Sequence, residues 1–193
     1  MFGDVLSNDL GWTIARMDKV APVKSFHGKS DSEDGKYWLL NLDMIEAQTG
    51  RVISKNMVLQ TKIGNSTMAF SVENVLYSKL RPYLNKVVIP DKNGYATTEL
   101  LPLKPDKSVL NPVFFVELLR GNAFLEYIQK KVAGTKMPRI QMDVFNSFSV
   151  ILPPLPLQNR FADFVRQTDK SKFTAENWLN LLVLLYAGVL DTI

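Results

Sequence analysis

The sequence lacks cysteine, and it contains a single histidine, His27, in 193 residues. Without cysteine there are no disulfides, no thiolate metal sites and no cysteine nucleophile, and nothing indicates an oxidising compartment. One histidine cannot build a histidine-rich metal site or supply more than one general base. These absences exclude several catalytic classes before any motif is considered.

Long hydrophobic runs are also missing. The longest apolar run covers residues 181–190, about half of the roughly 20 residues that a membrane span needs. The amino terminus has neither the basic region nor the apolar region of a signal peptide. With 46% hydrophobic and 22% charged residues, the composition is typical of a globular protein that folds in water. We therefore expect a cytoplasmic protein without a membrane partner, built as one domain or as one domain with an appended element.

The common catalytic motifs are absent as well. Gly134-Thr135-Lys136 lacks the upstream glycine of a phosphate-binding loop, and there is no glycine-rich dinucleotide fingerprint. The only Pro-Pro pair, Pro153-Pro154, is flanked by leucines, so it does not form the tetrapeptide of a DNA-amino methyltransferase. No pair of carboxylates has the spacing of a metal-dependent nuclease. The sequence favours binding over catalysis, and we expect no metal or cofactor in this chain.

Basic charge is concentrated in one third of the sequence. The net charge is +4 overall. Residues 76–140 hold eleven lysines and arginines against five acids, a net charge of +6, whereas the segments before and after each carry −1. Such an excess can arise without a function, but it is also the electrostatic signature of a polyanion-binding face.

Two compact segments carry much of this charge. Residues 78–86 interleave three cations with apolar residues, and an extended chain would place Lys79 and Arg81 on one side before Pro82 makes a turn. Residues 134–140 form a second basic loop with a hydroxyl, after a helix that ends in two lysines. Cations, hydroxyls and an arginine are what contact with DNA phosphates and guanine needs. The alternative is that these cations are solvated or complement a helix dipole.

The patterning predicts an α+β fold. Aromatic and β-branched residues favour strands over 37–42, 50–53, 66–70, 86–90, 95–103 and 148–152. Residues 28–35 are predicted to form a polar surface loop. Asn111-Pro112 is typical of a helix start, and a second helix is expected over 123–132, with Gly134 at its end.

The carboxyl-terminal segment predicts a long helix. Apolar or small residues recur at alternating three- and four-residue spacing from Phe161 to Val189, with no glycine or proline from residue 157 to Gly188. A helix of about 33 residues would be roughly 50 Å long. It should project and pair with another helix, unless it packs back on its own domain.

Several separated motifs, in order, resemble the DNA-specificity (S) subunit of type I restriction-modification enzymes. They are Met1-Phe-Gly-Asp4 with Gly11-Trp12, the segment 76–84 with Lys86, Thr97-Thr-Glu99, Gly134-Thr-Lys-Met-Pro-Arg-Ile140, the segment 151–158 and the segment 168–173. The similarity covers almost the whole chain.

The resemblance implies a β-rich target-recognition domain with small helices over residues 1–155, followed by a spacer helix over 156–193 for coiled-coil pairing. Such a subunit is non-catalytic and directs its partners to a split site in double-stranded DNA. Those partners are methyltransferase subunits, which use S-adenosylmethionine, and restriction subunits, which use ATP and Mg²⁺. A usual S subunit carries two such units, so one unit is expected to be a half subunit or a fragment that pairs with a second copy or with another half subunit.

The resemblance also places the candidate site residues. DNA-binding positions fall on Lys79, Arg81, Lys86, Thr135, Lys136 and Arg139, and the pairing seam falls on Phe161, Phe164, Trp178, Leu182 and Leu185. Two alternatives stay open at this point. One is an interaction or regulatory protein that docks on methyltransferase subunits without reading DNA, and the other is a self-sufficient nuclease or methyltransferase.

Overall fold

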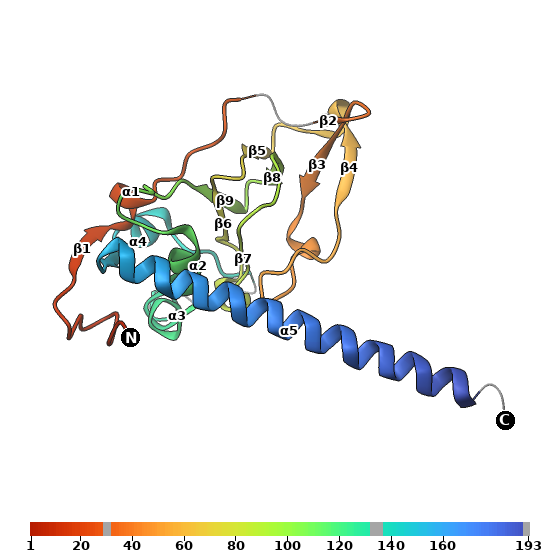
Figure 1. Cartoon of the computed structure of the whole chain (residues 1–193). Helices are drawn as coiled ribbons and strands as arrows, with labels where there is room; N and C mark the ends of the chain where they lie inside the picture. The colour runs from red at the N-terminus through yellow and green to blue at the C-terminus, as the bar shows by residue number, and fades with distance from the viewer. Residues whose placement is uncertain (29–31, 132–136, 191–193) are drawn as a thin grey trace.

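The fold is α+β, as the patterning predicts, with three small sheets and a long carboxyl-terminal helix (Figure 1). The structure, a computed structural model, describes residues 1–28, 32–131 and 137–190, and their side chains except at 172, 173 and 176–190. Within these residues, no helix is long and apolar enough to cross a membrane.

A three-stranded antiparallel sheet lies in the middle of the chain's fold. It consists of β6 (Val75–Ser78) between β7 (Val87–Val88) and β9 (Leu100–Leu103). Ser78 is opposite Leu100 and Val75 is opposite Leu103. Every residue of these strands is buried, so the central sheet is a framework whose ends carry the exposed loops.

A second sheet has five strands and includes the β2–β3 hairpin. Its strands are β2 (Ser32–Glu33), β3 (Lys36–Leu40), β4 (Asn56–Leu59), β5 (Thr67–Phe70) and β8 (Gly94–Thr97). The pairing of β3 with β8 is parallel and the others are antiparallel. Buried Trp38 packs edge-to-face on Phe70, with ring centroids 5.3 Å apart, and forms the smaller of two cores.

The larger core lies under the helices. It is bounded by the pair β1 (Thr13–Arg16) and β10 (Ser149–Leu152) and by α1 (Met17–Val20), α2 (Pro112–Arg120), α3 (Asn122–Gln129) and α4 (Met142–Asn146). Phe124 lies at its centre, fully buried, with ring contacts to Tyr77, Phe145 and Phe148.

The predicted start of α2 is confirmed. The Asn111 side chain accepts hydrogen bonds from the backbone N–H groups of Val113 and Phe114, and Pro112 occupies the first helical position. Asparagine is favoured before a helix because its side chain accepts from backbone N–H groups that have no partner in the first turn. Proline is favoured at the first position because it has no backbone N–H that would need a partner.

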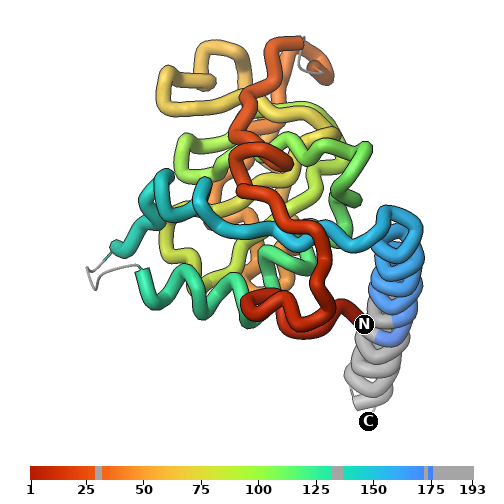
Figure 2. Tube along the Cα trace, turned by 90° about the vertical axis from the view of Figure 1, so that its left-hand side faces the viewer, coloured from red at the N-terminus to blue at the C-terminus, as the bar shows by residue number. Residues whose placement is uncertain are grey.

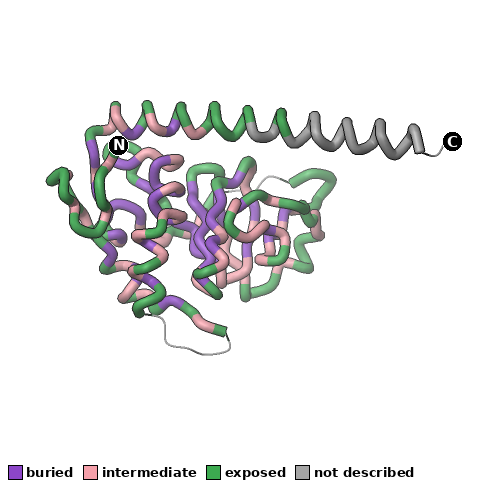
Figure 3. The backbone as a smooth tube through the Cα atoms, turned by 90° about the horizontal axis from the view of Figure 1, so that it is seen from below, coloured by how far each residue is buried: buried purple, intermediate pink, exposed green. Residues whose placement is uncertain are grey.

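The last helix, α5 (Leu155–Leu190), extends beyond the rest of the fold (Figure 1), and its first turns run along one side of it (Figure 2). Its first turns contain buried and half-buried positions, and residues 166–171 are exposed (Figure 3). The amino-terminal segment lies beside it, since the Phe2 ring contacts Phe161 at 5.2 Å and Phe114 at 4.9 Å. The proposed domain division at residue 155 stays a prediction.

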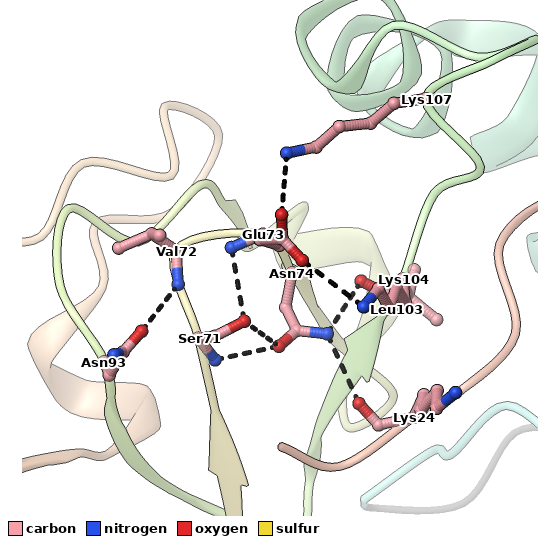
Figure 4. Close-up of polar contacts among 9 residues, drawn as sticks. All are labelled: Lys24, Ser71, Val72, Glu73, Asn74, Asn93, Leu103, Lys104 and Lys107. Atoms are coloured by element: carbon pink, nitrogen blue, oxygen red, sulfur yellow. Dashed lines mark hydrogen bonds and ion pairs between the residues drawn. The ribbon is translucent and has the colours of Figure 1, made fainter. Parts of the chain in front are cut away.

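A polar cluster closes the end of the central sheet that lies away from Leu100 (Figure 4). The buried Asn74 side chain accepts from the Ser71 backbone N–H and donates to the carbonyls of Lys24 and Leu103. The Glu73 carboxylate pairs with Lys104 and Lys107, both at 3.3 Å. Hydrogen bonds from these two ammonium groups hold the pKa of Glu73 below its ordinary value.

Several predicted elements were wrong in their limits. The strand expected over 95–103 is two strands in different sheets, β8 and β9, because the chain turns at 98–99. The segment 50–53 forms no strand and contributes only a bridge between Val52 and Ile45. The expected loop 28–35 ends in the β2–β3 hairpin, where Asp34 and Gly35 both have positive φ. Gly134 lies outside the described residues.

Candidate nucleic-acid interface

The described parts of the two basic segments of the sequence lie side by side in the fold. Leu80 forms an antiparallel bridge with Arg139. The Ile140 N–H donates to the Lys79 carbonyl at 3.0 Å, and the Arg81 N–H donates to the Pro138 carbonyl at 2.8 Å. Backbone pairing therefore joins residues 79–81 to residues 138–140. We call the group of residues Lys79, Arg81, Tyr83, Met137 and Arg139 on these paired segments the basic ridge; Lys79 is half-buried and the other four are exposed.

The backbone at Arg81 is left-handed. Its φ is 48°, and Asn85 at the other end of the turn Pro82–Leu84 has a φ of 52°. A residue with a Cβ atom adopts this conformation at some energetic cost, and such positions cluster at functional sites. The extended alternation predicted for residues 79–81 therefore ends at Leu80, and Pro82 makes the predicted turn.

Hydrogen bonds hold this turn in place. The Asn85 side-chain amide donates to the Arg120 carbonyl at 3.0 Å, and the Ser78 hydroxyl donates to the Leu80 carbonyl at 2.8 Å. Tyr83 is 45% exposed on the same turn, and Arg81 is exposed. The result is a hydrogen-bonded loop on which Arg81 and Tyr83 are exposed to solvent.

Arg139 is held by an acid. Its Nε lies 3.0 Å from Glu99 Oε1. Glu99 lies in the turn between β8 and β9, and its backbone carbonyl accepts from the Lys79 N–H. The family resemblance includes Glu99 in its motif, but the sequence alone assigns this residue no role. The sequence also did not predict that the Tyr83 ring and the Met137 side chain are exposed beside these cations in the chain, because exposure has no local sequence signal.

Of the remaining predicted DNA-binding residues, the structure describes only Lys86. The Lys86 ammonium donates to the Leu42 carbonyl at 2.6 Å, and the residue is half-buried. Lys86 therefore makes a hydrogen bond within the fold. Thr135 and Lys136 lie outside the described residues.

The predicted seam residues of α5 divide in the same way. Phe161 is half-buried against the rings of Phe2 and Phe114, so it packs within its own chain. Phe164 is 63% exposed. The side chains of Trp178, Leu182 and Leu185 lie outside the described part of the chain.

A family model described as the type I restriction modification DNA specificity domain matches residues 10–183. The chain belongs to this family. Its fold agrees with this membership: the HsdS subunit from Thermoanaerobacter tengcongensis has a TM-score of 0.63 at 21% identity, covering 90% of this chain and 48% of that one. A second structure comes from work on complex assembly and conformational transition of the type I R-M system. It has a TM-score of 0.68 at 17% identity, and the match covers 86% of this chain and 44% of that one.

Curated relatives are longer proteins. The EcoDI specificity subunit of Escherichia coli is 27% identical over 169 residues, which are 88% of this chain and 37% of the relative. The HindI specificity subunit of Haemophilus influenzae is 27% identical over 112 residues, 55% of this chain and 24% of the relative. The chain thus spans about a third or less of the length of the curated specificity subunits that it matches.

Two clefts of this specificity domain are lined by residues other than those of the basic ridge. A cleft of about 710 Å³ lies between the loop 46–51, α2 and α5, and one of about 330 Å³ lies between residues 2–5, α2 and α5. Neither is lined by Lys79, Arg81 or Arg139. Among the described residues, no three histidines or acids are grouped as metal ligands. The candidate interface is therefore a mostly exposed, cationic group of residues outside both of these clefts.

Proposed function

We propose that this chain reads DNA for a type I restriction-modification system and has no catalytic activity of its own. The observation that carries the proposal is the basic ridge, in which two segments of a specificity-family chain pair through their backbones and bring Lys79, Arg81 and Arg139 to neighbouring positions. Exposed cations neutralise phosphates, and the arginine fork can also bond a guanine edge. The Tyr83 ring offers an apolar contact surface on the same turn.

The chemistry of such a system belongs to other subunits in this proposal. Methyltransferase subunits would bind S-adenosylmethionine, restriction subunits would bind ATP and Mg²⁺, and this chain would bring both to a site in cytoplasmic DNA. Family membership supports this arrangement.

Selection from randomised DNA duplexes tests the reading function. The purified chain is used to retain duplexes over several rounds, and the retained pool is sequenced. We expect a recurring base pattern in the retained duplexes and an affinity that falls steeply with salt, since each neutralised phosphate contributes about 0.9 to the salt slope. If the chain pulls down methyltransferase subunits but retains no duplex, the docking-only alternative is correct.

We further propose that α5 pairs with a second copy through Phe164, Trp178, Leu182 and Leu185. Exposed Phe164 on a helix of 36 residues supports this pairing. Light scattering should give the mass of two chains for wild type and of one chain for Trp178→Asp. Asn180→Asp adds the same charge off the seam and should leave the dimer intact. A twofold pair would also read an interrupted palindrome. A wild-type mass of one chain, or a Trp178→Asp dimer, would contradict the pairing.

A further inference from the structure

Glu99 and Arg139 lie on opposite sides of the segment 79–81. The Lys79 N–H donates to the Glu99 carbonyl on one side, and Leu80 bridges to Arg139 on the other. The ion pair between their side chains, 3.0 Å from Nε to Oε1, therefore crosses over this segment. Together with these backbone contacts, the ion pair connects the segment 79–81, the turn at Glu99 and the segment at Arg139, which are far apart in sequence.

The pair uses only part of the arginine. Nε bonds to Glu99, while the described residues provide no partner for the two terminal amino groups, and the Arg139 side chain is 47% exposed. Glu99 is 23% exposed, and its second oxygen, Oε2, is buried without a hydrogen-bond partner among the described residues. A pair serving stability alone gains most when both oxygens meet both arms of the guanidinium fork. Here the two terminal amino groups of a half-exposed arginine stay without a partner among the described residues, and the carboxylate is incompletely satisfied, which is unfavourable for a buried oxygen.

We propose that Glu99 is a positioning residue that orients the Arg139 fork toward DNA. This inference rests on the proposed DNA-reading function. The two terminal amino groups form a donor pair whose partner is a pair of acceptors, either N7 and O6 of a guanine or two oxygens of a phosphate. With Nε fixed, the side chain loses less conformational freedom on binding than a free arginine would.

Whether removing the Glu99 charge weakens or strengthens DNA binding distinguishes a positioning role from a general electrostatic effect. Glu99 is an acid beside a DNA-binding surface, so removing its charge would strengthen binding if only the net field mattered. A positioning role predicts the opposite, because the freed guanidinium must be ordered anew when DNA binds. It also predicts that Glu99 has no effect once Arg139 is gone.

The test measures the affinity of the full chain for a duplex retained in the selection and for the unselected pool. The variants are Glu99→Gln, Arg139→Ala and the double variant. Glu99→Gln should weaken binding by about fivefold, the difference between a hydrogen bond to a charged acceptor and one to a neutral acceptor, and the double variant should equal Arg139→Ala. Glu126→Gln is the matched control, since it removes an acid that pairs with exposed Lys130 in the same basic third, and it should not weaken binding.

Each outcome decides one point. Unchanged or tighter binding by Glu99→Gln would overturn the proposal, as would an equal loss in the Arg139→Ala background. A loss confined to the retained duplex supports a guanine partner, and a loss of equal size on the unselected pool supports a phosphate partner. If Glu99→Gln does not fold, Arg139→Lys replaces it: the lysine keeps the charge without the fork, and full binding by that variant would overturn the proposal. Failure of the DNA-reading function is distinct, because wild type would then retain no duplex.

Discussion

Replacing Gln158 with alanine is expected to lower the free energy of unfolding by about 3 kcal/mol. Gln158 lies in the first turn of α5 and is fully buried. Its carbonyl accepts from the Asn111 N–H, and its amide donates to the carbonyls of Val109 and Pro153, all within 2.9 Å. The side chain thus joins the start of α5 to the start of α2.

Alanine at this position leaves one backbone N–H and two carbonyls without partners and also creates a cavity. For a chain of this size, about 3 kcal/mol corresponds to a decrease of roughly 10 °C in melting temperature. Gln167→Ala is the matched control, because it makes the same change at an exposed position of the same helix and should change stability by no more than about 0.5 kcal/mol. Equal thermal melts for the two variants would contradict the proposed anchoring of α5.

Removing two cations from the basic ridge is expected to weaken DNA binding by about 30-fold. The variant is Lys79→Gln with Arg81→Gln, and the estimate assigns about 1 kcal/mol to each lost contact. The salt slope should also fall by about 2, one for each phosphate contact. Neither side chain has an ion-pair partner among the described residues, so the folded state should lose little stability.

The matched control is Lys104→Gln with Lys107→Gln. It changes the net charge equally, but these lysines pair with Glu73. The two lysines follow the last residue of β9, Leu103, whereas Ser78, next to the basic ridge, is opposite the first residue of β9, Leu100. The length of β9 therefore separates Lys104 from the basic ridge. Titrations followed by fluorescence anisotropy should show a small loss for the control and a large loss for the ridge variant. If both variants lose affinity equally, overall charge rather than the basic ridge governs binding.

Local signals predicted those elements that depend on neighbouring residues. The Asn111-Pro112 helix start is such a case, because the cap bonds to residues two and three positions ahead. The strand predicted over 148–152, which is β10, follows equally from a short-range pattern. The turn at 98–99 lacks glycine, proline or asparagine, so nothing in the sequence marks the break between β8 and β9. The Asp34-Gly35 hairpin does carry a known turn signal, which the loop interpretation overlooked.

The candidate site was predictable in its residue types but not in its pairing. The sequence shows two basic segments, yet their meeting depends on backbone bonds between residues far apart, such as Arg81 with Pro138. In the same way, no local signal shows that the Lys86 ammonium is bound to the Leu42 carbonyl. The roles of all the predicted DNA-binding and seam residues remain predictions from the resemblance, and the side chains of Thr135, Lys136, Trp178, Leu182 and Leu185 also lie outside the described part of the chain.

Photo-crosslinking of a selected duplex, with mass spectrometry of the linked peptides, tests the central claim most directly. Tyr83 and Met137 are exposed on the basic ridge, at 45% and 46%, and offer reactive side chains beside the cations. We predict crosslinks to peptides that contain residues 81–84 and 137–139, and none to the peptide with Lys104 and Lys107. Crosslinks to the latter peptide, with the ridge peptides unmodified, would contradict the assignment of this surface to DNA.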